Sequence, residues 1–123
     1  MNEKEHKAQL TQQRQAYEDF QAGLPEVRVE GGAALTRLLK IVFDDNGQSR
    51  LVAGFLLGLY DGARFKVNLN ALRALQTDVF DDCMKVLRMD YTPYKKVHEY
   101  FENGAALFEQ MAADWGTPDR TDM

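Results

Sequence analysis

The run 51–60 (LVAGFLLGLY) constrains the fold most, because a helix of this sequence is apolar on nearly every side. Surface helices keep a polar face toward water, so a helix without one belongs in the buried centre of a domain. A membrane-spanning helix takes about 20 apolar residues, so this run is too short to cross a bilayer. We therefore expect a soluble, cytoplasmic protein with no membrane partner, built around one enclosed helix.

The start of this central helix carries recognisable signals. Asn46–Gly47 precedes it, and both residues accept the backbone angles of a turn. Gln48 or Ser49 caps the helix, and serine is the better capping type. Gly54 and Gly58 lie four residues apart on one face, although glycine costs about 1 kcal/mol in a helix interior. This spacing predicts that another helix crosses closely there.

Most of the remaining chain has the apolar spacing of amphipathic helices, most clearly where Leu35, Leu38, Leu39 and Val42 recur along one face. We therefore expect an all-α fold, a compact single-domain array of about six helices with short connections. The pattern predicts these helices over residues 2–22, 33–45, 49–61, 69–75 (with Asn68 as N-cap), 77–89, and 92–115, the last breaking or kinking at Asn103–Gly104.

The N-terminal helix has few apolar residues, namely Leu10, Tyr17 and Phe20. Gly23 is expected to end it, because Pro25 follows and proline cannot continue a helix. Residues 26–32 (EVRVEGG) alternate apolar and charged positions and are expected to form an extended linker. An alternative keeps a minor two-stranded β-ribbon, in which 27–29 pairs with 65–68.

The length of 123 residues indicates one domain. Within it we expect a weakly docked N-terminal helix at 1–22, a helical core domain at 23–116 and a flexible tail at 117–123. A helix with so few core contacts often finds its partner in another chain. The N-terminal helix is therefore a candidate arm for a homodimer, although a merely peripheral helix fits the sequence equally well.

The net charge of the chain and its reactive residues narrow the range of functions that the sequence allows. The net charge of −4 disfavours a general nucleic-acid binder, which is usually basic. The single Cys83 cannot form an internal disulfide and is expected in the core as an inert thiol. His98 and Glu102 lie one helical turn apart but lack a second histidine, and Asp44–Gly47 lacks the register of a calcium loop. We expect no metal, no cofactor and no catalytic residue.

Two groups of residues are candidates for an interaction surface. The first surrounds the turn before the central helix, where exposed amides and Arg50 are able to attract an anion, but where a simple connection between helices is the favoured interpretation. The second combines basic residues with tyrosines, a mixture that suits phosphates or a partner protein, although acids are interspersed. Together the candidates are Asp44, Asp45, Gln48, Arg50, Lys85, Arg88, Tyr91, Tyr94, Lys95 and Lys96.

The central region also resembles a family. Asp45-Asn46-Gly47-Gln48-Ser49-Arg50, followed by Val52-Ala53 and Phe55-Leu56-Leu57, is similar to the motif D-x-GQSR-x-V-A-x-FLL of small uncharacterised bacterial proteins found on proteobacterial mobile elements. The resemblance covers roughly residues 32–90. It departs after Tyr60, where other members tend to carry tryptophans and this chain has Asp61-Gly62-Ala63. The resemblance implies a mobile-element context and a compact helical domain, and no reaction.

We therefore expect a non-enzymatic accessory protein of a bacterial mobile element that binds another protein, with anti-defence as one such role. A nucleic-acid-associated helical protein that uses the Lys85–Lys96 region is the first alternative, and it fails if the basic residues there are dispersed among acids. A small enzyme is the second alternative. It would need His98, a carboxylate and a serine to converge in one cleft.

Overall fold

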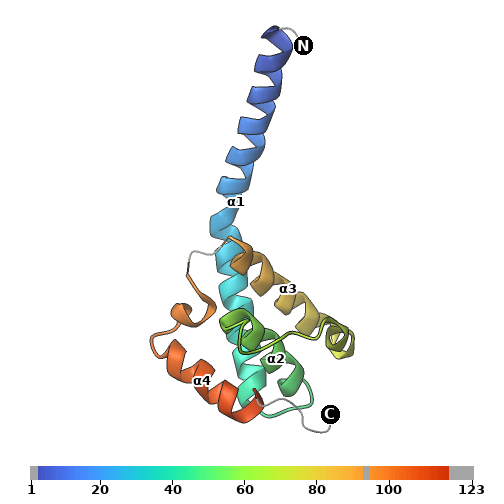
Figure 1. Ribbon diagram of the computed structural model, residues 1–123, viewed down its shortest axis with the longest axis vertical. Coiled ribbons are helices and arrows are strands. Elements are labelled where there is room, and N and C mark those ends of the chain that lie inside the picture. The colour runs from blue at the N-terminus through green and yellow to red at the C-terminus, as the bar shows by residue number, and fades with distance from the viewer. Residues whose placement is uncertain (1–2, 93–94, 117–123) are drawn as a thin grey trace.

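The computed structural model describes residues 3–92 and 95–116, without the side chains of residue 6 and residues 17–22. These residues form an all-α domain, as expected, with four α-helices and two short 3-10 helices (Figure 1). In chain order the elements are α1 (Glu3–Phe43), α2 (Ser49–Tyr60), η1 (Leu69–Ala74), α3 (Thr77–Tyr91), η2 (Val97–Tyr100) and α4 (Gly104–Trp115).

The helix α2 is the buried centre that the sequence predicts. It contacts all five other elements. Val52, Ala53 and Leu56 are fully buried, and Phe55 is 4% exposed. The other helices contribute the rest of the core, with Leu35 and Leu38 from α1 and Phe108 and Met111 from α4 among the fully buried side chains.

The helix α3 packs antiparallel along the C-terminal half of α1. Near the middle of the contact, the guanidinium of Arg37 donates two hydrogen bonds to the carboxylate of Asp82, at 2.9 and 2.8 Å. About two turns earlier in α1 and two turns later in α3, Gly31 is buried against Met89. A Cβ atom at position 31 would lie 2.6 Å from the Met89 Cβ and 3.1 Å from the Lys85 carbonyl oxygen. Glycine therefore allows the two helices to approach.

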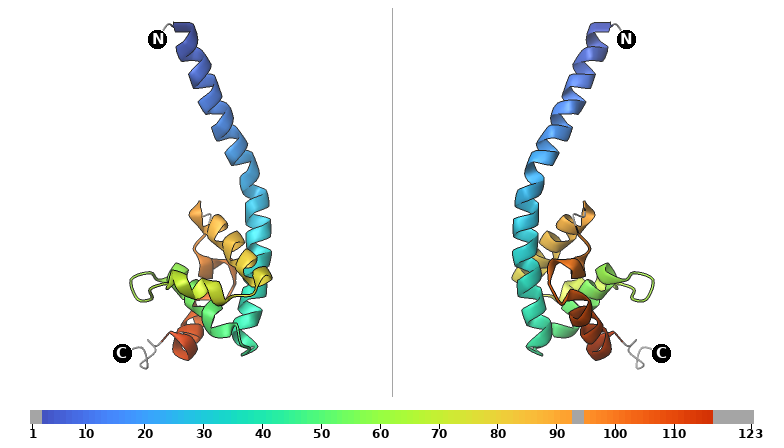
Figure 2. Two further views of the ribbon diagram at one scale, coloured as in Figure 1. Left: turned by 90° about the vertical axis from the view of Figure 1, so that its right-hand side faces the viewer. Right: turned by 90° about the vertical axis from the view of Figure 1, so that its left-hand side faces the viewer.

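The N-terminal half of α1 projects alone from the rest of the molecule (Figures 1 and 2). The helix has 41 residues, which corresponds to about 60 Å at 1.5 Å per residue. We call residues 3–22 the arm. Every arm side chain that the structure describes is exposed, including Leu10 at 48%. The described arm side chains therefore lack the packing that normally stabilises a helix in a protein.

The expected helix end at Gly23 is wrong, since α1 continues through Pro25. Proline removes one backbone hydrogen bond and bends a helix without always ending it, and α1 changes direction along its length (Figure 2). The expected linker at 26–32 and the alternative β-ribbon are also wrong, because 26–32 belongs to α1 and no strand occurs in residues 3–92 and 95–116. Val27 is half-buried on the side of α1 that packs against the core, whereas Val29 lies on another side and is 72% exposed.

Two local expectations for α2 are also corrected. No helix crosses at Gly54, because a Cβ atom there would meet nothing within 4 Å. A Cβ atom at Gly58 would overlap the side chain of Val67, so a loop makes the close approach at that position. Ser49 is not the N-cap of α2. The cap position is Gln48, and Ser49 lies fully buried one residue later.

Candidate functional site

The turn between α1 and α2 is a structural connection held by side-chain hydrogen bonds. Asp45 adopts a positive φ of 52°, which reverses the chain. The Oγ of Ser49 donates to the Ile41 carbonyl oxygen at 2.6 Å and accepts from the backbone N–H of Asn46 at 2.7 Å. The buried Ser49 side chain therefore links the end of α1 to the start of the turn through two part-buried hydrogen bonds.

Gln48 ties the same turn to a distant segment. Its Oε1 accepts from the backbone N–H of Gln76 at 2.8 Å, and its Nε2 lies 3.4 Å from the Ala74 carbonyl oxygen. The side chain is therefore engaged between the start of α2 and the start of α3. These contacts favour the interpretation of this turn as a connection between helices, while Asp44, Asp45 and Arg50 remain on its exposed side.

The second group of candidate residues does not form one cluster. Lys85, Arg88 and Tyr91 follow one another along the C-terminal half of α3. Lys95 Nζ lies 5.9 Å from the ring centroid of Tyr100, and Lys96 is the exposed N-cap of η2. Tyr94 lies outside the described residues, and so does Pro93, which follows the predicted helix start at Thr92.

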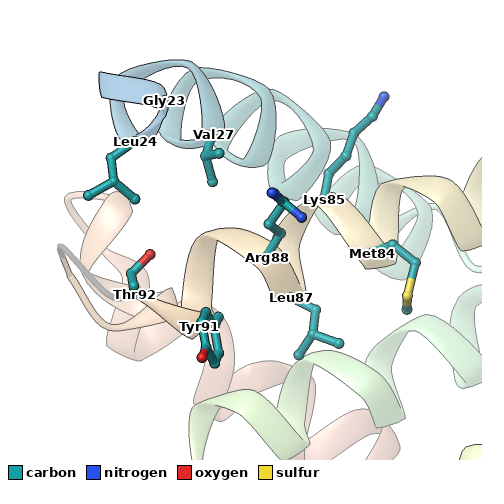
Figure 3. Close-up of a pocket in the computed structure, with 9 residues that line it drawn as sticks. All are labelled: Gly23, Leu24, Val27, Met84, Lys85, Leu87, Arg88, Tyr91 and Thr92. Atoms are coloured by element: carbon teal, nitrogen blue, oxygen red, sulfur yellow. The ribbon is translucent and has the colours of Figure 1, made fainter. Parts of the chain in front are cut away.

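Lys85, Arg88 and Tyr91 instead line a groove of about 640 Å³ between α1 and α3. We call it the α1–α3 groove. Leu24 and Val27 point from α1 toward α3, and Arg88 and Thr92 point back toward α1 (Figure 3). Its other lining residues are Gly23, Met84, Lys85, Leu87 and Tyr91.

The groove lies at the base of the arm and is largely apolar. The apolar spacing of Val79, Cys83, Val86 and Leu87 in the sequence predicts that Leu87 faces the core, but Leu87 is 42% exposed. Tyr91 is 79% exposed. The sequence signal for this site was incomplete, because Leu24 was assigned to the end of a helix and Val27 to a linker. Reading 2–45 as one helix would have placed Leu24, Val27 and Gly31 on the face that packs against α3.

Acidic groups lie beside the two cations of the groove. Lys85 Nζ is 4.0 Å from a carboxylate oxygen of Asp82, which also binds Arg37. Glu26 and Glu30 of α1 line an adjoining depression together with Lys85 and Arg88. The cations are therefore mixed with acids, in contrast to the continuous basic surface that binds phosphates.

A polar cluster that the sequence did not indicate joins the end of α2 to α4. Arg64 donates to both carboxylate oxygens of Glu109, at 2.8 and 3.1 Å, and the hydroxyl of Tyr60 donates to the same carboxylate at 2.5 Å. The hydrogen bonds from Arg64 and then Tyr60 lower the pKa of Glu109 to about 2. The hydrogen bond that the Tyr60 hydroxyl donates to Glu109 raises the pKa of Tyr60 above its ordinary value.

The residues considered for catalysis or metal binding lie apart. Cys83 is fully buried in α3, as expected for a core thiol, and burial followed by the charge of Asp82 raises its pKa to about 12. His98 stacks edge-on against Tyr60, with ring centroids 5.1 Å apart, whereas Ser49 lies in the α1–α2 turn. Among the described residues, no three His, Cys, Asp or Glu side chains come close enough to hold a metal ion.

None of the helices, as far as they are described, combines the length and apolar character that a membrane span requires. The comparisons with curated proteins and with solved structures find no match. A family model does match residues 32–116, which is more than half of the chain. The match begins after the arm and includes α2, α3 and α4 completely. The chain therefore belongs to the family described as a family of unknown function (DUF7673).

Proposed function

We propose that the chain is a non-enzymatic protein that binds another protein through the α1–α3 groove and the adjoining face of the arm. The observation that carries this proposal is the groove itself, an apolar depression of about 640 Å³ at the base of an unpacked helix. Apolar surface left uncovered in this way commonly marks a protein interaction site. The arm lies outside the stretch that the family model matches.

The shape and charge of the groove suit an amphipathic helix as the docking element. A helix lays its apolar stripe into a groove between two helices, with anchors at i, i+3, i+4 and i+7. Leu24, Val27 and Leu87 offer the apolar contacts, while Lys85 and Arg88 offer partners for carboxylates beside the stripe. A second copy of the chain, paired through the arm, is one source of such a helix.

The acids beside Lys85 and Arg88 support a protein partner over a nucleic acid. Asp82 lies 4.0 Å from Lys85, and Glu26 and Glu30 line the depression that adjoins the groove, so all three carboxylates would repel a phosphate backbone bound there. We also propose that the chain acts in the cytoplasm as an accessory or anti-defence protein of a bacterial mobile element. The support for this role is the resemblance of the Asp45–Leu57 motif to that of small uncharacterised proteins found on such elements.

Affinity capture from the native host tests the proposal, with mass spectrometry and a nucleic-acid stain of the same sample. The wild-type chain is compared with Leu87→Glu, which places a charge in the groove at a side chain already 42% exposed. Leu69→Glu is the matched control, because Leu69 is 73% exposed on η1. We expect a protein that the wild type and Leu69→Glu retain and Leu87→Glu loses.

Recovery of nucleic acid alone would contradict the proposal, and so would a protein partner that Leu87→Glu retains as well as the wild type. Sedimentation equilibrium of the purified chain distinguishes the two sources of the docking helix. A dimer that Leu87→Glu dissociates identifies a second copy as the partner, whereas a monomer assigns the groove to a different protein.

A further inference from the structure

A second pocket lies on another part of the molecule and shares no residue with the α1–α3 groove. It is formed by α2, the loop 61–68, η1 and the C-terminal end of α4, and has a volume of about 600 Å³. This lies within the usual range for small-molecule sites, about 300–1,000 Å³. Its walls are mostly apolar and include Leu51, Phe55, Val67, Leu72 and Trp115.

Three cations and no acid occur among the described residues that line this pocket, although the chain has a net charge of −4. The cations are Arg50 at the start of α2 and Arg64 and Lys66 in the loop. Glu109 offsets much of the charge of Arg64 and fixes its guanidinium, which lies 4.8 Å from the ring centroid of Phe65. Lys66 Nζ donates to the Gly62 carbonyl oxygen at 2.9 Å. An ammonium group has three N–H donors, so Lys66 has others to offer an anion.

The floor of the pocket contains a glycine that the fold does not require. Gly54 is exposed in the middle of α2, and a Cβ atom there would meet nothing within 4 Å. Gly58 differs, because its Cβ atom would overlap Val67. Glycine inside a helix destabilises it relative to alanine. The empty position at Gly54 therefore enlarges the pocket at the expense of helix stability.

From these observations we propose that the pocket binds an amphipathic anion, a molecule with one aliphatic chain and a carboxylate or phosphate head. The aliphatic chain lies against Leu51, Phe55 and Leu72 above Gly54, and the head accepts hydrogen bonds from Arg50 and Lys66. The apolar walls bury the aliphatic chain of the ligand, and the cations select the charge of its head group. Small-molecule sites commonly combine apolar walls with a few polar groups in this way.

Trp115 provides a direct readout, because it lines the pocket and is the only tryptophan of the chain. Its fluorescence is titrated with dodecanoate and with dodecyl phosphate, each below its micelle concentration. Dodecyltrimethylammonium has the same chain with a cationic head and serves as the comparison. We expect saturable binding of one or both anions, several-fold tighter than that of the cation. The better anion identifies the head group, and equal binding of anions and cation would overturn the proposal.

Two glycine variants separate the pocket from general adsorption. Gly54→Leu fills the floor and is expected to abolish the saturable fluorescence change without lowering the melting temperature. Gly32→Leu is the matched control, since Gly32 is also an uncrowded glycine within a helix but does not line the pocket. Lys66→Gln is expected to weaken the anions several-fold and leave the cation unchanged. Undiminished binding of dodecanoate and dodecyl phosphate by Gly54→Leu would show that the site lies elsewhere.

Discussion

At the scale of single residues, two arginine–carboxylate pairs join segments that are far apart in the chain. Arg37 binds Asp82 and Arg64 binds Glu109, and each pair is separated by 45 residues. No local spacing in the sequence relates residues at such a separation, so neither pair was predictable. Both pairs are bidentate, a geometry that fixes direction as well as distance. They orient α3 on α1 and α4 on the end of α2.

The pair of Arg64 and Glu109 predicts a pH dependence of stability. The pKa of Glu109 is lowered to about 2 in the folded protein from an ordinary 4.5. The ionised carboxylate therefore stabilises the fold at pH above 4.5, and this contribution is lost as the pH falls from 4.5 toward 2. Thermal unfolding followed by circular dichroism, from about pH 6 to about pH 2, is expected to show a steeper loss for the wild type than for Glu109→Gln.

Glu102→Gln is the control for this comparison, because Glu102 is an exposed carboxylate near α4 without a comparable contact in the described structure. It should follow the wild-type curve. If Glu109→Gln follows the wild-type curve as well, the contact with Arg64 does not persist in solution.

At the scale of elements, the helices that pack on the core were predictable and the continuity of α1 was not. The spacing of Leu35, Leu38 and Val42 gave only the last part of α1, from residue 33 onward. Similar apolar spacing gave α2 and α3 within a few residues, and the predicted break at Asn103–Gly104 coincides with the start of α4. Gly23 and Pro25 are strong local stop signals. Tertiary contact overrides them, because Val27 and Gly31 pack against α3 only when the helix continues through both positions.

The two adjacent glycines of α1 give a matched test of this contact. A Cβ atom at Gly31 would lie 2.6 Å from the Met89 Cβ, whereas a Cβ atom at Gly32 would meet nothing within 4 Å. Gly31→Ala is expected to destabilise the fold by about 1–3 kcal/mol through overpacking. Gly32→Ala is expected to stabilise it by up to about 1 kcal/mol through helix propensity.

Urea denaturation of both variants measures these free energies of unfolding. The sign of the difference is the decisive result. Two substitutions of equal effect would mean that α1 and α3 do not approach closely at Gly31, and that residues 26–32 adopt a different structure in solution.

At the scale of the whole molecule, the enclosure of α2 followed from its composition, because an apolar helix has to be covered on all sides. What the sequence could not give is which apolar residues the other helices leave uncovered. The helical spacing places Leu87 and Phe80 on the same side of α3 as Cys83 and Val86. Leu87 and Phe80 are nevertheless 42% and 37% exposed, whereas Cys83 and Val86 are fully buried. Exposure at these positions depends on where neighbouring helices end. For the same reason the α1–α3 groove and the pocket beside Gly54 were not predictable from the local pattern.

Cys83 offers a measurement of how firmly this enclosure holds. The thiol is fully buried and its pKa is raised to about 12, first by burial and then by the charge of Asp82. A thiol reacts with an electrophilic dye as the exposed thiolate, which is the nucleophile, so labelling requires the core to open. We expect slow labelling whose rate follows the population of the unfolded chain. Phe55 is 4% exposed in the centre of the core, and Phe55→Ala should cost about 3–5 kcal/mol.

That loss of stability raises the unfolded population, and with it the labelling rate of Cys83, by about two to four orders of magnitude. Leu69→Ala serves as the control, because Leu69 is 73% exposed and its removal leaves the core intact. The two rates, measured in the same buffer, separate global from local opening. A rate that Phe55→Ala leaves unchanged would mean that α3 detaches locally from α1 and exposes Cys83 while α2 remains enclosed, so that the α1–α3 groove would be a moving surface and not a fixed one.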